Sequence, residues 1–247
     1  MIRSIGSLCL TVKCLAASRS RIPLRMASTV SVGTTLGKAD VLRFWFGDEY
    51  FEDREALSRP GYMESQNDRW WMGGPEMDAQ CESFADLVRA AGAGKLVGEE
   101  WEEPNGKVAR VLLCDQIARG AFRGTTEAFA YDEVACGLSM QAIENGEDMP
   151  GILTFAERWF LYVALMHSEN AETHELCLAR FHSYLEHYPE LEADVRFGIG
   201  FEEAHYDVIK RFGRYPHRNK ALGRENTPEE TEFLAQDDLP AWMRSQG

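Results

Sequence analysis

The chain has 247 residues, of which 45% are hydrophobic and 11% aromatic, so it is long enough to bury one sizeable core. It carries 26 Lys and Arg residues against 40 Asp and Glu residues, which gives a formal net charge of -14. Such an acidic surface repels phosphates and argues against a nucleic-acid partner. No apolar run reaches the roughly 18 residues that a membrane helix needs, so no membrane partner is expected.

Residues 1–28 differ in composition from the rest of the chain. They are rich in basic residues and serine and contain no Asp or Glu. This composition resembles an organellar transit peptide, with a mitochondrial destination favoured over a plastid, and a secretory signal is disfavoured because Lys13 interrupts the apolar stretch. Residues 29–39 are then a flexible linker and residues 40–247 a single domain. Alternatively, Met26 is a second start, which would give a cytosolic product.

The sequence predicts an all-α domain, because helix caps recur along the chain and sustained strand alternation is missing. Pro75 and Pro189 favour helix starts, and two capping boxes, beginning at Thr154 and Thr227, predict two more. About eight helices are expected. The six cysteines include no C-x-x-C pair and are predicted to be reduced thiols.

Charged residues interrupt an apolar stripe in the middle of the chain. Asp115 and Arg119 continue the helical spacing of Val108, Val111 and Leu112, so both are expected to face the interior. Burying them costs several kcal/mol unless further partners satisfy their polar atoms. They are candidates for a functional site, or a structural pin between helices.

The next polar group, His167-Ser168-Glu169, follows a very apolar helix. Both His167 and Glu169 continue apolar stripes of that helix and are expected to point inward from different faces. The histidine is a candidate base and the carboxylate a candidate orienting group, with a helix C-cap and an ion pair as the structural alternatives. His205 occupies a third apolar stripe, whereas His174, His182 and His187 are expected to be solvated or structural.

The segment RFGRYPHRNKALGR, from Arg211 to Arg224, concentrates positive charge in an acidic protein. Gly213 is expected to end a helix and Pro216 to hold Tyr215 extended, which would place the segment along a cleft. Its guanidiniums suit two-point binding of a carboxylate or phosphate. Since Asp115 and Glu169 can neutralise at most two of them, at least one is expected to face a ligand.

Four sequence motifs closely resemble an uncharacterised family catalogued as domain of unknown function 924. They are VLRFWFGDEY at 41–50, LLCDQIARGAFRGT at 112–125, LMHSEN at 165–170 and HYDVIKRFGRYPHRNKALGRENTPEE at 205–230. The resemblance implies a compact helical fold similar to the tetratricopeptide (TPR) superfamily, with antiparallel helices, although no sequence repeat is evident. It implies no reaction. Gly120 stands where the family usually has asparagine, and we expect a glycine helix cap there.

These observations favour a pocket for a small anionic ligand, with hydrolysis or group transfer as the possible chemistry. The predicted catalytic residues are His167, Glu169, His217 and Asp115. The predicted ligand-binding residues are Gln116, Arg119, His205, Arg211, Arg214, Arg218, Asn219 and Arg224. No phosphate-binding loop, dinucleotide fingerprint or nucleophile elbow is present, so the sequence names no cofactor.

Two alternatives remain open. A metal site would use His167, Glu169, His205 and His217, although the neighbouring guanidiniums would repel a cation. A protein-interaction scaffold would use the polar motifs as pins between helices, with Trp70 and Trp71 as a docking face or, alternatively, as ordinary core residues.

Overall fold

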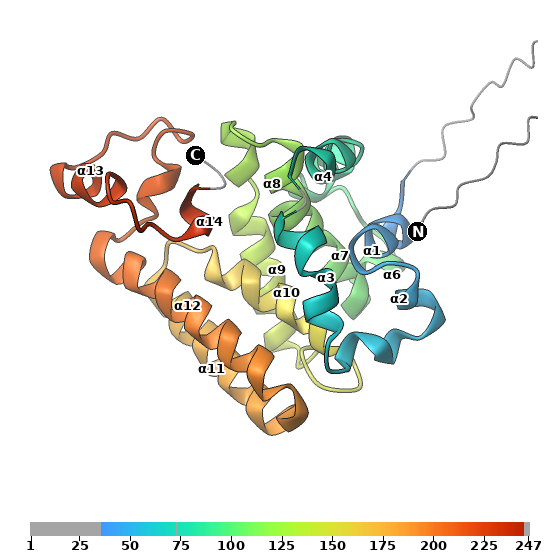
Figure 1. Ribbon diagram of the computed structural model, residues 1–247. Helices are drawn as coiled ribbons and strands as arrows, with labels where there is room; N and C mark the ends of the chain where they lie inside the picture. Colours follow the sequence, from blue (N-terminus) through green and yellow to red (C-terminus); the bar gives the residue numbers. More distant parts are fainter. Residues whose placement is uncertain (1–35, 73, 245–247) are drawn as a thin grey trace, which may run out of the picture. The chain divides into compact units, whose positions relative to one another are not determined.

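Helices make up the regular structure of this computed structural model, which describes residues 36–72 and 74–244 (Figure 1). No strand occurs within these ranges, so the all-α prediction is confirmed. The predicted transit peptide, residues 29–35 of the predicted linker, and Cys9 and Cys14 lie outside the described residues. The other cysteines, Cys81, Cys114, Cys136 and Cys177, are free.

Several single-turn helices lie between the longer ones. The first half contains α1 (Lys38–Phe46), α2 (Glu49–Glu52), α3 (Tyr62–Met72), α4 (Gly74–Glu82), α5 (Ala85–Gly92), α6 (Glu99–Glu102) and α7 (Pro104–Leu112). The second half contains α8 (Ala118–Ala121), α9 (Asp132–Glu144), α10 (Phe155–Met166), α11 (Ala171–His187), α12 (Glu192–Phe212), α13 (Pro228–Leu234) and α14 (Ala241–Arg244).

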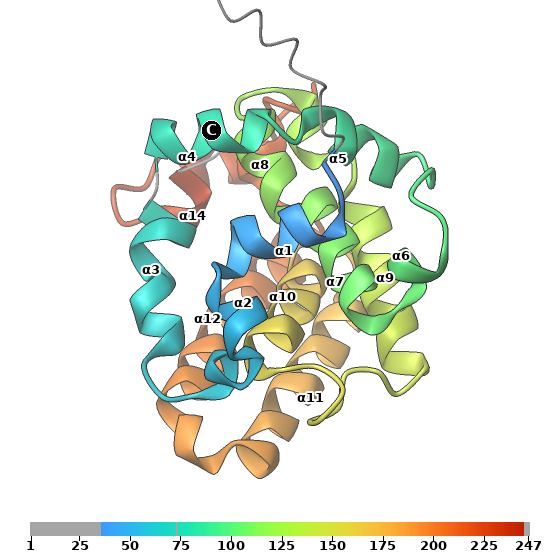
Figure 2. The same cartoon turned by 90° about the vertical axis from the view of Figure 1, so that its right-hand side faces the viewer.

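Helix α10 is the core of the fold, because every one of its residues from Phe155 to Met166 is buried. Its predicted capping box is present, with the Thr154 hydroxyl accepting from the backbone N–H of Glu157. The helix packs against α7, α9 and α11, and its Phe160 ring meets Trp70 at a centroid distance of 4.9 Å. Figure 2 shows α10 beneath α1 and beside α7. The C-terminus of α10 therefore ends inside the protein.

Helices α11 and α12 form an antiparallel pair joined by the short 3-10 turn Pro189–Leu191 (Figure 1). Close packing against α10 depends on Gly198, where an added Cβ would lie 2.6 Å from the Trp159 ring. Pairwise packing of consecutive helices agrees with the TPR-like arrangement implied by the family resemblance. No helix of the described part of the chain is long and apolar enough to cross a membrane.

The basic segment turns back from the end of α12 as predicted. Gly213 adopts a left-handed conformation with φ 68°, and Tyr215 is extended. Pro216–Arg218 forms a 3-10 turn, and the predicted Thr227 capping box begins α13. This return path brings the segment to the C-terminal end of α10.

Gly120 does not cap a helix, so that expectation is wrong. It lies within α8 and is buried against α4, where an added Cβ would lie 2.8 Å from Sγ and 2.9 Å from Cβ of Cys81. Its missing side chain permits the close approach of α4 and α8 rather than a left-handed turn.

Candidate functional site

The first part of the site is a π-helical turn, Leu113–Ile117, inserted between α7 and α8. A π turn adds one residue to a helical turn and often occurs at functional sites. The prediction for Asp115 assumed a uniform helical period, which this turn interrupts. In the π turn Asp115 and its neighbour Gln116 are both buried, and the side-chain amide of Gln116 donates to Asp115.

Asp115 holds the ring of His167. Its Oδ1 lies 2.6 Å from Nδ1 of His167 and 3.5 Å from a terminal guanidinium nitrogen of Arg119. Burial alone would raise the pKa of Asp115, but His167 and Arg119 together lower it to about 2. An ionised carboxylate at this position favours a proton on Nδ1 of His167. Nε2 then faces away from Asp115 and makes no hydrogen bond within the described residues.

The turn that carries His167 is held by its backbone carbonyls. His167 is the C-cap of α10 and Glu169 lies beyond the helix. The prediction that both residues continue apolar stripes of this helix is therefore wrong. Three consecutive carbonyls, those of Met166, His167 and Ser168, accept hydrogen bonds from side chains of other elements. The donors are the Tyr215 hydroxyl at 2.6 Å, the Arg218 guanidinium at 3.0 Å and Nε2 of His174 at 2.9 Å. These bonds satisfy carbonyls that a helix end leaves open.

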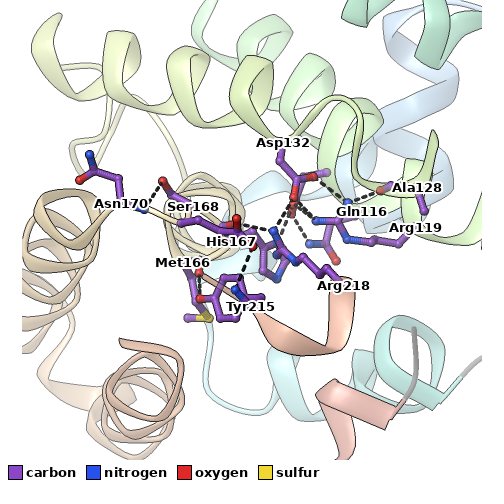
Figure 3. A network of polar contacts seen from close by, with 12 residues as sticks. Gln116, Arg119, Ala128, Asp132, Met166, His167, Ser168, Asn170, Tyr215 and Arg218 are labelled. Carbon is purple, nitrogen blue, oxygen red and sulfur yellow. Dashed lines mark hydrogen bonds and ion pairs between the residues drawn. The ribbon is translucent and has the colours of Figure 1, made fainter. Parts of the chain in front are cut away.

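Two buried guanidiniums converge on one carboxylate, as Figure 3 shows for Arg119, Arg218 and Asp132. Arg119 lies 2.7 Å from Asp132, and Arg218 lies 3.1 Å from it. Both guanidiniums also face the Phe129 ring, at 4.7 and 5.1 Å from its centroid. Burial lowers the pKa of Arg218, an effect that Asp132 opposes. Nε of Arg218 is buried and has no hydrogen-bond partner among the described residues.

Two neutral histidines, His205 and His217, lie near His167. The His205 ring lies 6.2 Å from the His167 ring and stacks on Trp242 of α14 at 3.7 Å. Its Nδ1 donates to the carbonyl of Phe201, and burial holds its pKa well below the usual range. Burial and the charge of Arg218 lower the pKa of His217 to about 2. The buried Nδ1 of His217 has no partner within the described chain.

The other predicted residues of the basic segment do not join this cluster directly. Arg224 makes a two-point ion pair with Glu169, which also accepts from the backbone N–H of Tyr215. Arg214 makes a two-point ion pair with Glu230 of the α13 capping box, and Asn219 donates to the same carboxylate. Arg211 pairs with Glu229 on the surface.

The prediction that at least one arginine of this segment faces a ligand assumed that Asp115 and Glu169 are its available carboxylates, and that assumption is wrong. Only Asp115 and Glu169 were counted as partners, whereas Asp132, Glu229 and Glu230 pair with three of the four arginines. The sequence offered no signal for Asp132 beyond its place at the start of a helix. The role of Glu230 could have been suspected, since its capping box directly follows the basic segment.

Of the two roles expected for His174, solvated or structural, the structure favours the structural one. It is fully buried, and its Nδ1 lies 2.7 Å from the equally buried carboxyl of Glu202. Burial raises the pKa of Glu202, and the contact with His174 partly offsets this rise. The pair ties α11 to α12 behind the His167 turn and supports the structural interpretation of His174.

Among the described residues, neither a metal cluster nor the surface hollow beside Gly120 coincides with the predicted residues. Within residues 36–72 and 74–244, no group of three or more His, Cys, Asp or Glu side chains could hold a metal ion. A surface hollow of about 540 Å³ lies beside Gly120 and includes Asp78, Glu82 and Glu127 in its lining. None of the predicted site residues lines it, and its carboxylates suit an anion poorly. The buried ion-pair cluster around His167, whose side chain is 18% exposed, is thus the better candidate.

Residues 41–238 match the family described as "Bacterial protein of unknown function (DUF924)". The chain belongs to this family. A solved structure of a protein of unknown function from Agrobacterium tumefaciens, ATU0120, is similar with a TM-score of 0.60 and 28% sequence identity. The similarity covers 80% of this chain and 96% of that one. No curated protein matches the chain.

Proposed function

We propose that this protein binds a small molecule through its carboxylate or phosphate group at the face formed by His167 and Arg218. We further propose that the His167–Asp115 pair transfers a proton there, as in a hydrolase or transferase. The observation that carries the binding proposal is the Nε–H of Arg218, a buried donor with no partner among the described residues. Leaving such a donor unsatisfied costs about 1–3 kcal/mol or more, so an acceptor oxygen at this place would be favourable.

The proton-transfer role rests on the orientation of His167. Asp115 fixes the ring through Nδ1, and the three carbonyl contacts fix the turn from which it projects. A general acid or base must be held within hydrogen-bond reach of the atom with which it exchanges a proton, and rigid support of this kind supplies that precision. His205 and His217 lie nearby and are neutral, so neither ring adds a charge that would attract or repel an incoming anion.

Thermal unfolding with added inorganic phosphate or acetate tests the binding proposal. Each is compared with chloride at the same ionic strength. At about ten times its dissociation constant, a bound anion should raise the melting temperature of the wild type by roughly 3–5 °C. Arg211→Ala removes an exposed guanidinium of the same segment and should preserve the shift. Arg218→Lys should reduce it, because lysine lacks the Nε–H fork.

Should Arg218→Lys fail to fold, the histidine NMR signals of the wild type test whether the anion binds at this site. Phosphate or acetate should shift the His167 and His217 signals and leave that of exposed His182 unchanged. If neither the melting temperature nor these signals respond to either anion, the proposal is wrong.

A protein-interaction scaffold is the second candidate, because aromatic side chains are exposed on two helices. Phe197 of α12 is 65% exposed and Trp71 of α3 is 45% exposed, whereas Trp70 is buried in the core. The arginines of the basic segment, each paired with a carboxylate, would then serve only as structural pins. Under this alternative His167→Ala lowers the melting temperature, and no anion shifts the melting temperature of either protein.

A further inference from the structure

The cluster around His167 is electrically balanced. Arg119 and Arg218 are its guanidiniums, and Asp115 and Asp132 are its carboxylates, each within 4 Å of a guanidinium. The adjoining pair of Glu169 and Arg224 is also balanced. An anion that enters the cluster therefore meets no fixed excess of positive charge.

Among the histidines of this region, His167 is the one that can change the charge balance of the cluster. His205 and His217 face it from α12 and from the 3-10 turn, and both are held neutral by burial. The His174–Glu202 pair behind the turn is fully buried, with Nδ1 of His174 2.7 Å from a carboxylate oxygen of Glu202. The charged and titratable groups of the cluster and its immediate surroundings are thus Asp115, Arg119, Asp132, His174, Glu202, His205, His217 and Arg218.

A proton on His167 adds one positive charge and leaves its contact with Asp115 in place. The imidazolium keeps Nδ1–H directed at Asp115 and gains a second donor at Nε2. A singly charged ligand would then restore neutrality, whereas a doubly charged one would leave an uncompensated charge in a buried site, which is costly.

Resting on the proposed function, we propose that this site takes a singly charged anion, such as a monocarboxylate or a phosphodiester, together with one proton that resides on His167. The proton comes from solvent and returns there when the anion leaves. Singly charged ligands are thereby selected over doubly charged ones of the same shape. Affinity falls as pH rises.

Calorimetric titration with methanesulfonate and sulfate tests this selection on the full chain. The two probes share a similar oxygen-bearing head and differ in charge, and neither changes charge near neutral pH. Methanesulfonate should bind at least about tenfold more tightly than sulfate, the equivalent of about 1.4 kcal/mol. Titrations in two buffers of different ionisation enthalpy should show uptake of about one proton. The affinity for methanesulfonate should fall about tenfold per pH unit at pH values where His167 is neutral in the free protein.

His167→Gln separates the proton from the hydrogen bond, because glutamine can still donate to Asp115 but cannot be charged. Methanesulfonate should bind this variant more weakly and without dependence on pH. His182→Gln changes an exposed histidine and should behave as the wild type. Should His167→Gln not fold, the His167 NMR signals of the wild type should move to the imidazolium position at saturating methanesulfonate.

Tighter binding of sulfate, or binding without proton uptake, would overturn this inference and leave the proposed function standing. The same holds if phosphate binds and neither probe does. If no anion binds at any pH, the proposed function itself fails.

Discussion

At the level of single residues, buried charges here are compensated by partners from distant parts of the chain. Asp115 is paired with His167, and Arg119 and Arg218 share Asp132. Each pairing lowers the cost of removing the charge from water. The sequence could place Asp115 and Arg119 in the interior, because their spacing matched an apolar stripe. It could not supply Asp132, since nothing local distinguishes a helix-starting carboxylate that pairs across the fold from one that faces solvent.

Asp115→Asn should lower the free energy of unfolding by about 2 kcal/mol at pH about 7. The folded pKa of Asp115, about 2, is below the unfolded value. Its stabilising contribution is therefore present above the unfolded pKa of about 3.9 and is lost as pH falls through the folded pKa. Urea unfolding at several pH values measures the deficit, which should shrink toward zero near pH about 2.

Asp86→Asn is the matched control, because Asp86 also lies near an arginine, 3.4 Å from Arg89, but is exposed to solvent. It should change the free energy of unfolding by less than about 0.5 kcal/mol throughout. A deficit in Asp115→Asn that stays constant with pH would mean that the native pair does not depress the pKa of Asp115.

At the level of elements, local sequence determined the helix boundaries best where a cap is self-contained. The Thr154 and Thr227 capping boxes and the Gly213 terminus lie where they were predicted. The π-helical turn at Leu113–Ile117 was not predicted, because the sequence was interpreted with a uniform helical period. Gly120 was misread because its role depends on Cys81, a residue of α4 that is distant along the chain.

Gly120→Ala should destabilise the protein by about 1–3 kcal/mol, because the new methyl group would overlap Cys81 and force α4 away from α8. This cost exceeds the gain of up to about 1 kcal/mol from better helix propensity. Gly137→Ala in α9 isolates that gain, since Gly137 is exposed and has no neighbouring atom within 4 Å of an added Cβ. Denaturant midpoints compare the two, and equal stability of both variants would contradict the packing role of Gly120.

At the level of the whole molecule, the buried apolar residues form two clusters of unequal size. The larger surrounds α10, and the smaller joins the end of α12 to the C-terminal helices through Val208, Ile209, Tyr215, Leu239 and Met243. The C-terminal segment closes the His205 side of the site, where Trp242 stacks on that ring. Regions with few buried contacts open at lower free energy than the main core.

Trp242→Ala should therefore increase amide hydrogen exchange in residues 239–244 and at the end of α12, while the exchange of α10 changes little. Phe160→Ala, in the centre of the larger cluster, should instead lower the global stability by about 3–5 kcal/mol and weaken protection everywhere. Native-state hydrogen exchange distinguishes these patterns. Uniform loss of protection in Trp242→Ala would show that the two clusters unfold as one.

The sequence by itself determined the helical class, the main caps, the very apolar α10 and the burial of Asp115, Arg119 and His205. These features follow from spacing and from contacts between residues close along the chain. Only the tertiary structure decided which carboxylate neutralises each arginine, how the π turn presents Asp115 to His167, and that His174 is buried. Those outcomes depend on side chains that are distant in sequence and meet only after the helices pack, so their energies cannot be assigned to any local pattern.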